Sequence, residues 1–125
     1  MNKEQLEKLS DLHINRMIVE SFGHKLDWDV KEHQDSGLCE TNYKDDAVYI
    51  TERGYLEFLN YCNNPSDMMP LAFEAGIDLV SPVSNASDDW QAGKFFLTWK
   101  SAINVYHKNP LRAAAIVWLL MQGEI

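Results

Sequence analysis

The chain has 125 residues, of which 46% are hydrophobic and 11% aromatic, and a formal net charge of −8 at pH 7. This length and apolar content predict one folded domain over residues 1–125 and exclude a largely disordered chain. The negative charge excludes a general binder of nucleic acids or anionic membranes, because such proteins need a basic face.

The cysteines and the first residues indicate the compartment. Cys39 and Cys62 form no Cys-x-x-Cys pair, and residues 1–8 are polar and charged, without the apolar segment of a secretion signal. The longest apolar run, residues 113–121, is far shorter than the roughly 20 residues that a membrane span needs. These features predict a cytoplasmic protein with reduced thiols and no membrane partner.

Residues 3–22 are expected to be helical. Ser10 is a candidate N-cap, and an apolar face recurs at helical spacing until Gly23 ends the helix, through Ile14, Met17, Ile18 and Phe22. Residues 2–8 fit either a preceding turn or a frayed extension of this helix.

Residues 25–32 alternate apolar and charged side chains, which predicts a strand with one solvated face. Residues 33–46 are polar and predict a surface loop. Within residues 26–46, seven acidic residues stand against two lysines. This charge fits a solvated acidic loop, or else a surface that binds a partner or mimics nucleic acid.

Residues 47–51 and 55–59 are short runs rich in β-forming residues, separated by the turn signal Arg53-Gly54. They favour a β-hairpin. A helix over residues 52–61 is the alternative, because the same apolar residues also fit a helical period.

Asn64 and Pro65 begin a predicted helix that ends at Gly76. Pro70 either kinks this helix or marks where the helix proper begins. Strands are expected at residues 77–80, 90–92, 94–99 and 101–106, with a loop at 81–89 and with Gly93 as a turn or bulge.

The closing helix, residues 109–123, is the element around which the chain is expected to be built. Asn109 is its candidate N-cap, Pro110 fits its first position and Gly123 its end. Since residues 113–121 are apolar without interruption, this helix must be covered on several sides. The element order predicts an α+β fold: an antiparallel or mixed sheet covered by about three helices in layers, with the closing helix on the apolar side of the sheet.

Three blocks of sequence resemble the NinX-like proteins of tailed bacteriophages and prophages. The blocks are Leu9-Ser10-Asp11 with Ile14-Asn15; Cys62-Asn63-Asn64-Pro65-Ser66-Asp67 followed by Pro70; and Asn109-Pro110-Leu111-Arg112-Ala113-Ala114 running into Ile116-Val117 and Met121-Gln122. The resemblance covers most of the chain in order and spacing, and residues 25–46 match least. Where the family commonly has Ala-Trp before the proline of the middle block, this chain has Met68-Met69, so no role of an aromatic residue carries over.

The resemblance implies one NinX-like α+β domain over residues 1–125, a small phage accessory protein made in the bacterial cytoplasm. It implies no activity, cofactor or catalytic residue.

No catalytic or metal-binding motif stands out in the sequence. The four histidines lack the spacing of a zinc site, and His33, Asp35 and Cys39 are better explained as a coincidence of surface residues than as ligands. Cys62 precedes a helix start, which favours a reactive thiol, although a small buried residue is the simpler interpretation. We therefore expect no catalytic residue, no metal ligand and no cofactor.

The strongest candidate site is the start of the closing helix, at Asn109 and Arg112. A cation at a helix N-terminus opposes the helix dipole and needs compensation. Either an Asp or Glu side chain of the chain itself or a bound phosphate or carboxylate would supply it.

Two functions follow from these features. The first is a non-enzymatic accessory protein that binds a host protein. The alternative is a domain that binds a small ligand or nucleotide through an anion site at Asn109 and Arg112. A homodimer formed through an exposed sheet edge is also compatible with the sequence, and a cysteine or metal enzyme is the least supported reading.

Overall fold

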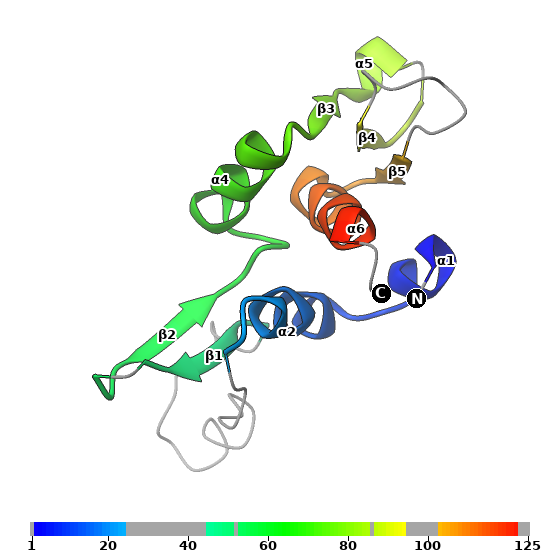
Figure 1. The fold of residues 1–125 in the computed structure, drawn as a ribbon. Helices are drawn as coiled ribbons and strands as arrows, with labels where there is room; N and C mark the ends of the chain where they lie inside the picture. Colours follow the sequence, from blue (N-terminus) through cyan, green and yellow to red (C-terminus); the bar gives the residue numbers. More distant parts are fainter. Residues whose placement is uncertain (1, 25–44, 52, 86, 95–102, 123–125) are drawn as a thin grey trace.

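The computed structural model describes residues 2–24, 45–51, 53–85, 87–94 and 103–122 of the chain. These residues form five helices and two separate antiparallel sheets, of two and three strands, which confirms the α+β prediction (Figure 1). The elements in chain order are α1 (Lys3–Glu7), α2 (Asp11–Ser21), β1 (Ala47–Ile50), β2 (Leu56–Leu59), α4 (Pro65–Ala75), β3 (Asp78–Val80), α5 (Pro82–Asn85), β4 (Trp90–Lys94), β5 (Ile103–His107) and α6 (Pro110–Gln122). None of the helices described is long and apolar enough to cross a membrane.

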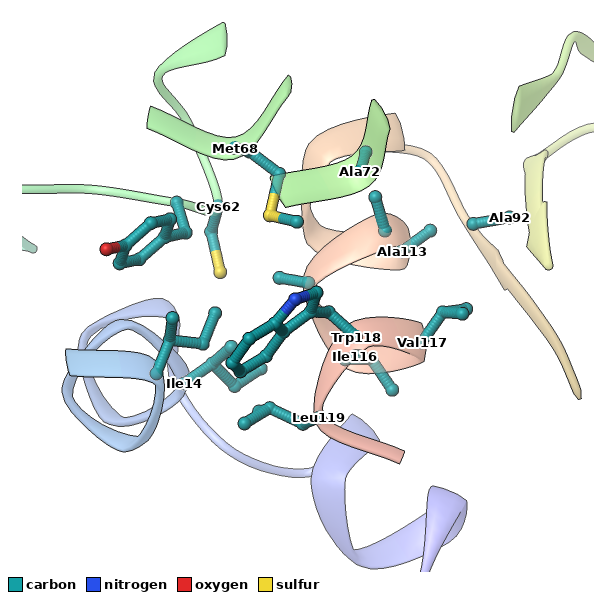
Figure 2. Close-up of a cluster of buried hydrophobic side chains, with 14 of the residues drawn as sticks. Ile14, Cys62, Met68, Ala72, Ala92, Ala113, Ile116, Val117, Trp118 and Leu119 are labelled. Atoms are coloured by element: carbon teal, nitrogen blue, oxygen red, sulfur yellow. The ribbon is translucent and has the colours of Figure 1, made fainter. Parts of the chain in front are cut away.

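Helix α6 lies at the centre of the molecule, as its unbroken apolar sequence predicts. Every residue from Arg112 to Leu119 is buried, and the helix contacts α1, α2, α4, β4 and β5 (Figure 1). Ala113, Ala114 and Ala115 are fully buried, which allows neighbouring elements to approach the helix closely. Ile116, Val117 and Leu119 fill the space between those elements (Figure 2), and burying each such side chain contributes about 1.5–3 kcal/mol.

Residues 2–22 form two helices rather than one. Asn2 caps α1 through a capping box with Gln5, whose side chain accepts a hydrogen bond from the Asn2 N–H. Ser10 then caps α2, since its hydroxyl accepts from the His13 N–H at 3.1 Å. The capping box explains why residues 2–8 are an ordered separate turn of helix and not an extension of α2.

Strands β1 and β2 form the predicted hairpin, and the alternative of a helix over residues 52–61 is wrong. Ala47 pairs with Leu59 and Ile50 with Leu56. The chain reverses at Gly54, which has a φ of +87° and is therefore in a conformation that favours glycine. The hairpin extends away from α6 and packs against α2 (Figure 1).

Helix α4 begins at Pro65, with Asn64 as its N-cap, and runs through Pro70 to Ala75. The alternative that the helix proper begins near Pro70 is therefore wrong. Proline at that position removes a hydrogen bond to the Ser66 carbonyl, but Ser66 and Pro70 are both exposed, so water can take its place. Gly76 ends the helix with a φ of +70°, as predicted.

Strands β3, β4 and β5 form the second sheet, which packs on α6 as expected of the closing helix. Gly93 pairs with both Asp78 and Asn104, so it is an ordinary ladder residue and neither a turn nor a bulge. The loop predicted at 81–89 instead contains the short helix α5. The predictions for residues 25–32, 33–44 and 95–99 and for Gly123 lie outside the described residues.

Candidate functional site

Arg112, the strongest candidate from the sequence, lies in the first turn of α6 with 8% of its side chain exposed. Its Nη1 donates to the Asp11 carboxylate at 2.5 Å. Its Nη2 donates to two backbone carbonyls, of Leu9 at 2.5 Å and of Glu7 at 3.1 Å. One guanidinium group thus joins α6 to the end of α1, to the connection between α1 and α2, and to the first residue of α2.

The position of Asp11 explains the compensation that Arg112 requires. Asp11 is the first residue of α2, where a carboxylate is stabilised by the positive end of that helix. Its charge offsets the unfavourable position of Arg112 at the start of α6. Of the two alternatives for Arg112, an internal partner is the one found. An anionic ligand at this place would have to displace Asp11 and the two carbonyls.

Asn109 caps α6 and also reaches another segment. Its Oδ1 accepts from the N–H groups of Leu111 and Arg112 at 3.0 and 3.4 Å, which confirms the predicted N-cap. Its Nδ2 donates to the Cys62 carbonyl at 2.6 Å and to Asn63 Oδ1 at 3.2 Å. The structure therefore brings Asn109 and Arg112 together, with both side chains engaged by the chain itself.

Asn15 is the residue that the site prediction missed. It is fully buried in α2. Its Nδ2 donates to the Asp45 carbonyl and to Asn60 Oδ1, both at 2.8 Å, and its Oδ1 accepts from the Cys62 N–H at 3.0 Å. A signal was present in the sequence, because a lone polar residue interrupts the apolar face formed by Ile14 and Ile18, and a buried amide in such a place requires partners.

Asn60 extends this set of contacts toward the hairpin. Its N–H donates to Asp67 Oδ2 at 2.9 Å, and its Nδ2 donates to Asp46 Oδ1 at 3.1 Å. Asn63 Nδ2 closes the set by donating to Asp11 Oδ2 and to Asn60 Oδ1, each at 3.1 Å. Burial raises the pKa of the Asp46 carboxyl, the hydrogen bond from Asn60 lowers it, and the charges of Asp67 and Asp45 raise it further.

We call these residues the asparagine network: Asp11, Asn15, Asn60, Cys62, Asn63, Asn109 and Arg112. No buried side-chain nitrogen or oxygen among the described residues lacks a hydrogen-bond partner. A buried network whose polar groups are all hydrogen-bonded fixes the relative positions of α2, α6 and the segment before α4.

Cys62 is fully buried within this network. Burial raises the pKa of its thiol above the ordinary range, the Asp11 carboxylate adds to the rise, and Arg112 opposes it. The helix start after Cys62 therefore does not produce a reactive thiolate, and the interpretation as a small buried residue is confirmed. Cys39, His33 and Asp35 lie outside the described residues.

This environment predicts that Cys62 is inert in the folded protein. In a Cys39→Ser variant at neutral pH, we expect no reaction with a disulfide reagent over the time in which the urea-unfolded protein reacts completely, because only the thiolate attacks and burial suppresses it. Absorbance of the released thiol measures both rates. Rapid labelling of the folded variant would contradict the buried position of Cys62.

A second feature is a groove between three helices, which we call the three-helix groove. It has a volume of about 260 Å³ and is lined by Phe22, Leu71, Glu74, Ala75, Trp118 and Gln122. Trp118, on α6, is 8% exposed and contacts Phe22, with 5.4 Å between the ring centroids. Phe22 is 49% exposed, so the groove presents an aromatic surface to solvent. The sequence predicted only that residues 113–121 are covered by other elements and did not reveal this groove.

Another groove, of about 250 Å³, runs along the outer face of α2 and is lined by Ser10, Leu12, His13, Arg16, Met17 and Glu20. Within the described parts of the chain, no three His, Cys, Asp or Glu residues are grouped so that they could hold a metal ion.

Comparison of the chain with models of protein families, with curated proteins and with solved structures gave no significant match.

Proposed function

We propose that this chain is a NinX-like accessory protein of a phage or prophage, cytoplasmic in the bacterial host, and that it acts by binding a host protein rather than by catalysis. The asparagine network supports the family assignment. Its residues come from all three blocks that carry the resemblance: Asp11 and Asn15 from the first, Cys62 and Asn63 from the second, and Asn109 and Arg112 from the third. If the three blocks together specify one fold, their residues are expected to contact one another in that fold, as they do in this network.

The observation that best supports binding over catalysis is that the key polar side chains are engaged within the chain, whereas several large apolar side chains are exposed. The polar side chains that a catalytic or anion site would need, those of Arg112 and Asn109, are engaged inside the chain. By contrast, large apolar side chains reach solvent, among them Phe22, Tyr55, Phe73 and Tyr106. Exposed aromatic surface beside polar residues is typical of protein interfaces.

The proposal is tested by capture. The tagged full chain, mixed with a lysate of a bacterial host, is expected to retain one host protein in constant ratio after washing, identified by mass spectrometry. Binding is then measured with that protein in purified form. A variant with Asp27, Asp29 and Glu32 changed to lysine tests whether the acidic residues at 26–46 contribute.

Failure to retain any host protein, together with a rise in melting temperature on adding a nucleotide, would contradict this proposal. That result would favour the alternative, a domain that binds a nucleotide through Arg112 and Asn109. Arg112→Lys would then abolish the rise, because the geometry of the guanidinium would be lost.

A further inference from the structure

Helices α2 and α4 end at the three-helix groove, which gives the groove an unusual electrostatic setting. Phe22 is the C-cap of α2, and Glu74 and Ala75 are the last two residues of α4. Gln122, the last residue of α6 that the structure describes, also lines the groove. The C-terminal end of a helix carries a partial negative charge of about half an elementary charge. Two such ends therefore adjoin one apolar surface.

Near the ends of α2 and α6, backbone carbonyls accept hydrogen bonds from the neutral donors Ser21 Oγ and Gln122 Nε2. None of α2, α4 and α6 has a basic residue in its last turn, where a cation is normally favoured. The described lining contains one carboxylate, Glu74, and no cationic side chain. The groove thus combines an aromatic surface with a negative rim.

We propose that the three-helix groove binds a polypeptide segment of a partner protein that presents a large apolar side chain next to a lysine or arginine. The apolar side chain would contact Phe22 and Trp118, and the cation would lie near Glu74 and the helix ends. The volume of about 260 Å³ suits one or two side chains and not a folded surface. This inference rests on the proposed function, since it specifies the partner's chemistry.

Charge also favours such a partner over a second copy of the chain. A twofold contact through this groove would place the negative ends of α2 and α4 and Glu74 against the same groups of the other copy, with no cation in the described lining to separate them. Each copy also carries a net charge of −8.

Two matched twelve-residue peptides test the inference. Both carry the same leucines and one phenylalanine, with lysine flanking them in one peptide and glutamate in the other. Fluorescence anisotropy of the labelled peptides measures binding to the full chain. We expect the lysine peptide to bind, more weakly as salt increases, and the glutamate peptide not to bind.

Two charge reversals distinguish an effect of charge at the groove from an effect of the net charge of the protein. Glu74→Lys is expected to weaken binding of the lysine peptide by about tenfold, because it places a cation within the rim. Glu57→Lys changes the net charge equally, but Glu57 is an exposed residue of β2 outside the groove, so binding should change by less than about twofold. Glu74→Lys also adds a favourable cation to the end of α4, so loss of folding is not expected.

A third pair tests the apolar contact. Phe22→Ser should weaken binding, whereas Phe73→Ser should not, because Phe73 is 75% exposed but does not line the groove. Thermal melting followed by circular dichroism checks that each variant is folded. Equal effects of Glu74→Lys and Glu57→Lys, equal binding of the two peptides, or no binding of the lysine peptide would each overturn the inference. So would a dimer that Phe22→Ser dissociates, because the occupant would then be a second copy.

These outcomes are distinguishable from failure of the proposed function. A captured host protein whose binding is unchanged by Glu74→Lys would leave the function standing and overturn the groove as its site. Binding of the lysine peptide with no captured host protein would support the groove and contradict the function.

Discussion

Replacing Arg112 by methionine is expected to lower the free energy of unfolding by about 3 kcal/mol. The substitution keeps most of the length of the side chain but leaves Asp11 without its cation and the carbonyls of Leu9 and Glu7 without their donor. The loss lies at the lower end of the range for a broken buried ion pair because 28% of the Asp11 side chain is exposed. Urea unfolding followed by circular dichroism measures the change.

Arg112→Lys is the matched control, because it keeps the charge but cannot bond the carboxylate and both carbonyls at once. An intermediate loss is expected. The free energy of unfolding of Arg112→Met could instead lie within about 0.5 kcal/mol of the native value, as it does for surface substitutions. In that case the arginine is not the link between α6 and α2 that its contacts indicate.

The second large effect is expected at Asn15. Asn15→Leu should lower the free energy of unfolding by about 2–3 kcal/mol, even though leucine has a similar size and the position is fully buried. The substitution leaves the buried Cys62 N–H without an acceptor and removes the donor to Asn60 and to the Asp45 carbonyl. The same urea titration gives the value.

Asn63→Ala provides the comparison. Asn63 also makes side-chain hydrogen bonds, to Asp11, Asn60 and Asn109, but these bonds are exposed to water, so its loss should cost less than about 1 kcal/mol. If Asn15→Leu and Asn63→Ala lose equal stability, then burial does not determine how much a hydrogen bond of the asparagine network contributes to the free energy of unfolding.

The elements that the sequence predicted best are those with local signals. The caps at Ser10, Asn64 and Asn109 and the end of α4 at Gly76 each depend on one residue and its neighbours in the chain, and each is found where expected. The burial of α6 was equally predictable, because a helix that is apolar all round has to be covered on several sides.

Non-local contacts could not be derived in the same way. The pairing of Gly93 with two strands depends on where β3 and β5 lie, and a glycine in a strand gives no sign of that. The need of Arg112 for a partner followed from the helix dipole, but its partner, 101 residues away, did not. The three-helix groove depends on where α2, α4 and α6 meet, which periodicity along a single segment cannot show.

Helix α6 is the element on which the rest of the chain is assembled, and native-state hydrogen exchange can show whether this holds. We expect the amides of Ala115 to Leu119 to exchange only by global unfolding, with the same free energy that urea unfolding gives, since these residues are buried among five other elements. The amides of the β1–β2 hairpin should exchange with a lower free energy. Exchange of the α6 amides by local opening, with a free energy equal to or lower than that of the hairpin, would show that the fold is not assembled on α6.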